Sequence, residues 1–225
     1  MTIKPPTVYN LNMSQSVAIS SKDRIIITAD GKSQDTVTKI ISLDVPKIFA
    51  LTDNVAATVV GMGIENLEKF MFDASFNIKY SQKVLQKLIS FEDIVDYMQA
   101  LIEQRIWAEN DKSFMNMIVV GYIGNLPQVR ALGTDENNMH KQNLSRLPRG
   151  SWDGADKYLI KKLKDKKPDK IEASVAEKVA IRLILKAEKA VPIEIGGKQM
   201  LWHIYPDNVD PKTSDYIDKL REKYS

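Results

Sequence analysis

The pattern of apolar and polar positions divides the chain into two kinds of segment. Segments that alternate with period two, or that form short β-branched runs, predict strands, and segments with a period near 3.6 predict helices. The runs 15–21 and 24–30 are separated by Lys-Asp, which is typical of a tight hairpin. Further strands are predicted at 39–51, 55–63, 113–124, 126–135 and 198–206.

The helical period is clearest at 90–109, where Ile94, Met98 and Leu101 recur on one face. Other helices are predicted at 64–79, 151–164, 174–190 and 214–225. Runs of strands followed by runs of helices predict a layered α+β domain rather than alternating βαβ units. This order of elements fits a four-layer αββα sandwich, in which two antiparallel sheets carry helix pairs on both outer faces.

Two of the predicted helices begin with a capping box. In this motif a side-chain hydroxyl accepts a backbone N–H three residues later, and the carboxyl group at that position reaches back. Ser90 with Asp93 fits the motif with Asp in place of Glu, and Ser174 with Glu177 fits it directly. We therefore interpret Glu177 as a capping residue.

The stretch Met13–Asp35, MSQSVAISSKDRIIITADGKSQD, resembles the start of a mature proteasome β-type chain of the N-terminal nucleophile hydrolase superfamily. That family opens with a nucleophilic Thr or Ser, an apolar strand, a tight turn, a second apolar strand and an acid. Here Ser14 and Asp30 stand at the two ends of this pattern, and their spacing matches the family.

A second stretch, 47–63, resembles the lysine-bearing strand of the same family and the glycine that ends its next strand. The spacing from Lys47 to Gly61 matches as well. The resemblance covers about 13–205 and is nearest in character to the bacterial proteasome-like peptidases, which form the ring component of a two-part ATP-dependent protease.

The resemblance implies a catalytic set of Ser14, Asp30, Lys47, Gly61 and Ser151. Ser14 would be the nucleophile and its own α-amino group the base, once Ser14 is the first residue. Lys47 would favour the developing alkoxide, and Asp30 would orient it, so we expect the two charged groups within about 4 Å of each other. The N–H of Gly61 would stabilise the oxyanion, and Ser151 lies in the counterpart of the family's Gly-Ser-Gly turn. No cofactor and no metal are implied.

The family resemblance divides the chain into three segments. We interpret 1–13 as a leader or propeptide-like segment, 14–205 as the hydrolase domain and 206–225 as an amphipathic helical extension. Cleavage after Met13, or a start of translation there, would expose Ser14, whereas a chain beginning at Met1 is expected to be inert.

The chain also departs from the family at two positions. Most proteasome-like peptidases carry an Asp and a Ser just before the Gly-Gly that precedes the last core strand, where they support the N-terminal amine. Pro192 and Ile195 occupy those positions here. An amine without this support would be a poorly placed base, so weak turnover is expected.

The composition argues against several kinds of site and of protein. With 225 residues, 44% hydrophobic and 27% charged, the chain has the composition of a globular domain. It has no cysteine, which excludes disulfides and thiolate metal sites and fits a reducing cytoplasm. Its two histidines, His140 and His203, lie far apart in sequence, which argues against zinc. No apolar run of about 18 residues is present, so no membrane span is expected.

The formal net charge is +3, and the one dense basic run is 161–170. It lacks interleaved aromatic residues, and Asp165 and Asp169 dilute it, so we interpret it as a solvated helix end and loop rather than a nucleic-acid site. The partners that the family resemblance implies are other copies of the chain in a ring, a peptide or unfolded protein substrate, and an AAA+ ATPase. The helix around Phe70, Met71 and Phe76 has more apolar surface than one face requires, which also favours self-association.

Three functional hypotheses remain open. The first is a serine-type member of the threonine peptidase group with Ser14 as nucleophile. The second is a non-catalytic ring or shell subunit of the same fold. The third is an unrelated small α+β binding domain that uses the basic run.

Overall fold

The computed structural model describes residues 15–34, 40–62, 67–108, 114–134, 139–143, 168–190, 192 and 195–225. These residues form an α+β structure in which every strand pairing is antiparallel. The α+β class and the antiparallel sheets predicted from the pattern are therefore confirmed. Among the described helices, none combines the length and apolar character needed to cross a membrane.

The described strands form three sheets. The first sheet has the order β1-β2-β10-β11, with β1 (Ser16–Ser20), β2 (Ile25–Ala29), β10 (Met200–Ile204) and β11 (Val209–Pro211). The second has the order β5-β6-β7-β8-β9, with β5 (Ile48–Ala50), β6 (Ala56–Met62), β7 (Phe114–Ile123), β8 (Leu126–Thr134) and β9 (Met139–Asn143). A short ladder joins β3 (Ser33–Gln34) to β4 (Ile41–Ser42).

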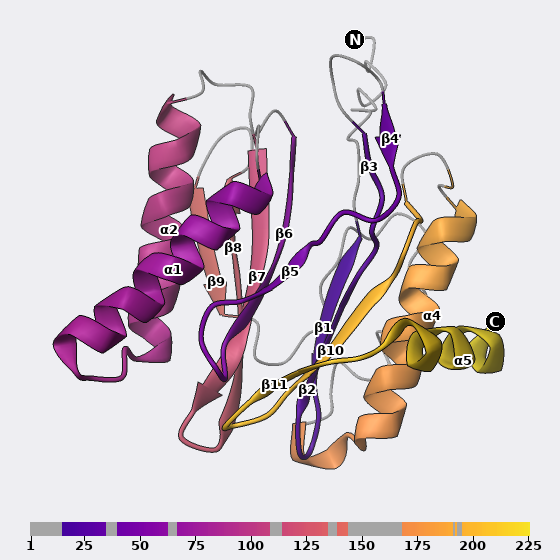
Figure 1. Ribbon diagram of the computed structural model, residues 1–225. Helices are drawn as coiled ribbons and strands as arrows, with labels where there is room; N and C mark the ends of the chain where they lie inside the picture. Colours follow the sequence, from indigo (N-terminus) through magenta and orange to yellow (C-terminus); the bar gives the residue numbers. More distant parts are fainter. Residues whose placement is uncertain are drawn as a thin grey trace, which may run out of the picture.

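Helices lie beside each of the two larger sheets (Figure 1). Helices α1 (Leu67–Leu85) and α2 (Phe91–Ala108) accompany the second sheet, and α4 (Ala173–Ala190) and α5 (Ser214–Tyr224) accompany the first. A short 3₁₀ helix, η1 (Pro168–Lys170), precedes α4. The helix predicted at 151–164 lies outside the described residues.

The continuous burial of β1 and β2 explains why their sequence reads as an unbroken apolar run. Ile26 faces the cluster that contains α4, whereas Ile25 and Ile27 face the cluster shared with the second sheet. Because successive side chains point to opposite faces, a strand covered on both sides needs apolar residues at every position.

Two local predictions need correction. The run 39–51 is predicted as one strand, but it contains two, β4 and β5, which belong to different sheets. Pro46 lies between them and has no N–H to donate to a ladder, which accounts for the break. The segment 206–225 is not only helical, because β11 pairs with β10 before α5 begins.

One of the two capping boxes forms in part, because Asp93 accepts from the hydroxyl of Ser90 rather than from its backbone N–H. The backbone N–H of Asp93 donates to Ser90 Oγ over 3.1 Å, and the Ser90 hydroxyl donates to the Asp93 carboxylate over 2.7 Å. The second does not form as expected, since α4 begins at Ala173 and Glu177 is buried with other partners. A buried carboxylate with better hydrogen-bond partners elsewhere has no reason to turn back to the helix start.

Candidate functional site

Asp30 immediately follows β2, and its side chain is completely buried. Its Oδ1 accepts hydrogen bonds from Lys47 Nζ at 3.0 Å and from the backbone N–H of Gln15 at 2.8 Å. Its Oδ2 accepts from the backbone N–H groups of Gly196 and Lys32, both at 3.3 Å. Four donors from four segments of the chain therefore converge on one carboxylate.

Lys47 precedes β5 and is as inaccessible as its partner, with 4% of the side chain exposed. Its ammonium group also donates to the backbone carbonyl of Lys32. Its backbone N–H lies 3.4 Å from the sulfur of Met200 on the neighbouring sheet. The ion pair expected between Lys47 and Asp30 is thus present, and it bridges the two large sheets.

The electrostatics of this pair are dominated by the loss of water. Burial raises the pKa of the Asp30 carboxyl above its ordinary value, and the charge and hydrogen bond of Lys47 oppose that shift. Burial likewise lowers the pKa of the Lys47 ammonium, against the attraction of Asp30. A lysine with a lowered pKa exchanges its proton more easily near neutral pH than a solvated lysine does.

Glycines allow the chain to approach Asp30 closely. Gly197 adopts a φ of +73°, and a Cβ placed there would lie 2.4 Å from the carbonyl oxygen of Leu43. A Cβ at Gly31 would lie 2.3 Å from the carbonyl oxygen of Lys198. The two segments can therefore pack backbone against backbone, which carries the N–H of Gly196 to the carboxylate.

Of the other three predicted site residues, Gly61 alone lies among the described residues. Ser14 and Ser151 lie outside the described residues. Gly61 lies in β6 opposite Met115, two residues beyond Val59, whose N–H donates to the carbonyl of Lys47. Gly61 therefore lies at the Lys47 end of the β5–β6 pair, while its catalytic role stays a prediction.

Pro192 and Ile195, the two positions that depart from the family pattern, contribute no polar side chain to the site. The carbonyl of Pro192 accepts a hydrogen bond of 2.8 Å from Lys32 Nζ, and the side chain of Ile195 is buried. Neither side chain can donate or accept a proton. Positions 192 and 195 could therefore support an amine only through their backbone groups.

A second buried charged cluster lies at the other end of β10, and no pattern in the sequence indicated it. Glu177 Oε1 lies 2.8 Å from His203 Nε2 and accepts a 2.7 Å hydrogen bond from the Tyr216 hydroxyl. Arg24 Nη1 lies 3.2 Å from His203 Nδ1. A guanidinium only donates, so Nδ1 accepts, and the proton of the neutral ring is on Nε2, which donates to Glu177. No local signal distinguished this Glu177 from a capping residue.

Within the described part of the chain, no group of three or more His, Asp or Glu side chains is arranged to hold a metal ion. Comparison of the chain with protein-family models and with curated proteins finds no match. The family resemblance therefore continues to depend on motif spacing and on the geometry around Asp30.

Proposed function

We propose that this protein is a proteasome-like N-terminal nucleophile peptidase, with Ser14 as the nucleophile once it becomes the first residue. The observation that carries the proposal is the buried Lys47–Asp30 pair, whose carboxylate also accepts the backbone N–H of Gln15. Gln15 follows Ser14 directly in the sequence. The chain is therefore anchored to the lysine–carboxylate pair one residue away from the candidate nucleophile.

The chemistry of the proposal assigns one task to each residue. The α-amino group of an exposed Ser14 takes the hydroxyl proton, and the alkoxide attacks the substrate carbonyl to form an ester as the amine product leaves. The positive charge of Lys47 stabilises the alkoxide, and Asp30 holds Lys47. The N–H of Gly61 stabilises the oxyanion, and water then hydrolyses the ester. Ser151 belongs to the catalytic set as the counterpart of the family's Gly-Ser-Gly turn.

The wider architecture supports the same proposal. Buried residues of β2, β6, β7 and β8 form one cluster between the two large sheets, while separate clusters join each sheet to its own helices. We infer a four-layer αββα sandwich from this arrangement. Rings of identical subunits, a peptide or unfolded protein substrate, an AAA+ ATPase partner and a cytoplasmic location follow from the proposed family.

A second candidate, the non-catalytic ring or shell subunit, is favoured by a different observation. The Lys47 ammonium already donates to both Asp30 and the Lys32 carbonyl, and Pro192 and Ile195 offer no polar side chain to an amine. In this alternative the pair only joins the two sheets.

An experiment on a chain that begins at Met13 separates the two candidates. Removal of that methionine, checked by N-terminal sequencing, exposes Ser14. The proposal expects a covalent adduct on Ser14, seen by intact mass, with an electrophile aimed at N-terminal hydroxyl nucleophiles, together with cleavage of small peptide amides. Ser14→Ala and Lys47→Ala should abolish both signals.

Lys198→Ala is the matched control, because the Lys198 side chain is exposed and its ammonium group pairs with a surface carboxylate, that of Asp44, rather than with Asp30. It should leave adduct formation unchanged. If a confirmed Ser14 terminus forms no adduct, the non-catalytic subunit is the better description. Light scattering tests the ring in either case, and a monomer at working concentration would contradict it.

A further inference from the structure

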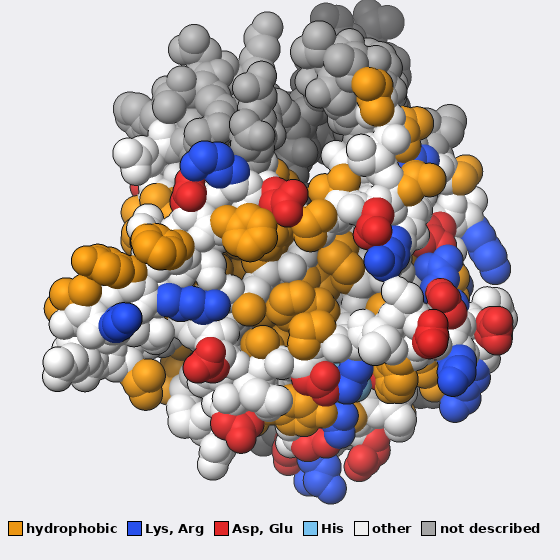
Figure 2. All heavy atoms as spheres, viewed as in Figure 1, with side chains coloured by type: hydrophobic (Ala, Val, Ile, Leu, Met, Phe, Trp, Pro, Cys, Tyr) orange, Lys and Arg blue, Asp and Glu red, His pale blue; other side chains and the backbone are white. Residues whose placement is uncertain are grey.

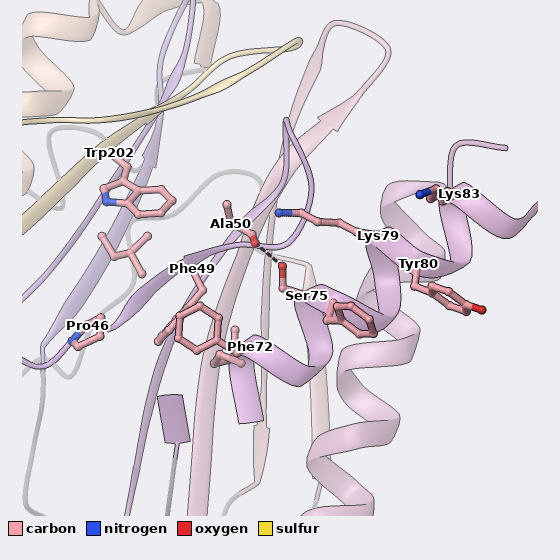
Figure 3. A pocket seen from close by; sticks show the side chains of 12 residues that line it. Pro46, Phe49, Ala50, Phe72, Ser75, Lys79, Tyr80, Lys83 and Trp202 are labelled. Carbon is pink, nitrogen blue, oxygen red and sulfur yellow. Dashed lines mark hydrogen bonds between the residues drawn. The ribbon is translucent and has the colours of Figure 1, made fainter. Parts of the chain in front are cut away.

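An open groove lies between the edge strand β5 and helix α1. It has a volume of about 680 Å³, and the aromatic rings of Phe49, Phe72, Phe76 and Trp202 contribute to its lining. Figure 3 shows Phe49, Phe72 and Trp202 around the groove, and Figure 2 shows apolar side chains gathered on the same face of the molecule. The groove is not part of the Asp30 cluster described above.

The backbone of β5 offers hydrogen-bonding groups to this groove. The N–H of Val59 donates to the carbonyl of Lys47, and the N–H of Leu51 donates to the carbonyl of Val55. Hydrogen-bonded pairs alternate along an antiparallel ladder, so residues 47, 49 and 51 pair with β6, while residues 48 and 50 point away from it. Because β5 is the edge of its sheet, these outward groups have no strand beside them.

One of the outward groups is already satisfied. The hydroxyl of Ser75 on α1 donates to the carbonyl of Ala50 over 2.8 Å, as the dashed line in Figure 3 shows. Among the described residues, no hydrogen bond uses the N–H or C=O of Ile48 or the N–H of Ala50. Ile48 is only 3% exposed, so an added strand would have to enter the groove to reach these groups. Edge groups of this kind are the usual template for pairing with an extended peptide.

The side chains around the groove indicate what such a peptide would carry. Phe72, Phe76 and Tyr80 follow one another at intervals of four residues on α1 and are 60%, 67% and 58% exposed. Lys79 and Lys83 complete the lining on the same helix. Among the described residues no acidic side chain lines the groove and neither lysine has an ion-pair partner, so a ligand with carboxylates is the electrostatic complement.

We propose that the β5 groove binds an extended polypeptide segment that carries a bulky apolar side chain and carboxylates, and that the segment pairs with β5 as an added strand. The main-chain bonds would go to Ile48 and Ala50, the apolar side chain would pack on Phe72 and Phe76, and the carboxylates would meet Lys79 and Lys83. The proposal does not depend on chemistry at Ser14.

The probe is a fluorescein-labelled, amidated peptide with the sequence Val-Phe-Val-Asp-Glu, titrated against the full chain by fluorescence anisotropy. We expect saturable binding. Two control peptides separate the contributions: one with Lys-Lys in place of Asp-Glu, and one with N-methylated backbone nitrogens. Both should bind about tenfold more weakly or worse, because the first loses charge complementarity and the second loses strand pairing.

Variants of the protein test the location. Phe76→Ser should weaken binding of the acidic peptide by about tenfold, while Leu88→Ser, at a separate site that is 84% exposed, should leave it unchanged. The double variant Lys79→Glu, Lys83→Glu should lose the acidic peptide and prefer the basic one. All four substituted positions are exposed, so thermal unfolding should show intact folds.

Hydrogen exchange tests the strand pairing directly. The peptide should slow exchange at the amides of Ile48 and Ala50 and leave that of Phe49, already paired with β6, unchanged. The absence of saturable binding, equal effects of Phe76→Ser and Leu88→Ser, or equal binding of the N-methylated peptide would overturn the proposal. So would a change in sedimentation on Phe76→Ser without peptide binding, which would make the groove a contact between copies.

Discussion

The two buried charged clusters of this protein use their carboxylates differently. Asp30 receives three backbone N–H groups besides the Lys47 ammonium. Glu177 receives only side chains, from His203 and Tyr216. Both carboxylates are at most 10% exposed, so burial alone does not distinguish them.

The difference lies in what each cluster holds in place. Backbone donors bind Asp30 to the segments around residues 15, 32 and 196, so its carboxylate sets the path of the main chain around the candidate site. The side-chain donors of Glu177 join α4 to β10 and α5, so this cluster attaches the C-terminal helix to the sheet. The first arrangement is suited to fixing the main chain around a site, and the second to attaching one helix.

The largest expected effect is that of Lys47→Met on stability. The variant leaves the Asp30 carboxylate buried without its cation, and we expect a loss of about 3–5 kcal/mol in the free energy of unfolding. Urea denaturation measures it. The double variant Asp30→Asn, Lys47→Met removes the unpaired charge and should recover part of the loss. If Lys47→Met alone costs nothing, the pair is not tightly coupled.

Glu177→Ala should cost less, about 2–3 kcal/mol, because it leaves the neutral donors of His203 and Tyr216 without their acceptor. The loss should be concentrated at α5, which hydrogen exchange can resolve. Glu177→Gln keeps an acceptor of the same shape and is the matched control. Equal exchange rates in α5 before and after Glu177→Ala would show that the cluster does not hold that helix.

Gly197→Ala, in the turn near Asp30, should lower the free energy of unfolding by about 2 kcal/mol. The new Cβ would meet the Leu43 carbonyl, and the residue has a positive φ. Gly124→Ala is the control, since its φ of +59° is also positive but nothing lies within 4 Å of the added atom. It should cost only about 1 kcal/mol. Thermal unfolding compares the two, and equal losses would mean that the turn can relax.

The smallest effects concern pH, and they should have opposite signs in the two clusters. Burial would raise the pKa of Glu177, but hydrogen bonds from His203 and Tyr216 hold it below its ordinary value of 4.5. The unfolded chain then binds more protons just below pH 4.5, so the stability due to Glu177 is present above that pH and is lost as the pH falls through the folded pKa. Glu177→Gln should make the free energy of unfolding less dependent on pH in this acidic range.

Asp30 should behave in the opposite way. Burial raises its pKa, so the folded chain keeps its proton above 3.8, where the unfolded chain has lost it. The favourable contribution is present below pH 3.8 and is lost as the pH rises through the folded pKa. Relative to the double variant Asp30→Asn, Lys47→Met, the native chain should therefore lose stability over that rise. Denaturation curves at several pH values measure both trends. If the free energy of unfolding changes with pH in the same way in the native chain and in the variants, these pKa directions are wrong.

The sequence by itself determined the elements whose pattern is local. The β1–β2 hairpin, helices α1, α2, α4 and α5, and the antiparallel α+β class follow from spacing between near neighbours. Motif spacing also singled out Asp30 and Lys47, which the fold brings to 3.0 Å. These features could be predicted because apolar period and turn chemistry are properties of short segments.

Only the tertiary structure decided which polar groups surround these residues. The N–H of Gly196 reaches Asp30 from 166 residues away, and Arg24 reaches His203 from 179 residues away. Glu177 was read as a helix cap because its sequence neighbours fit that motif, while its true partners come from β10 and α5. A buried polar group takes whichever partners the packed layers bring within reach, and that choice is made by contacts between distant segments, which local spacing does not encode.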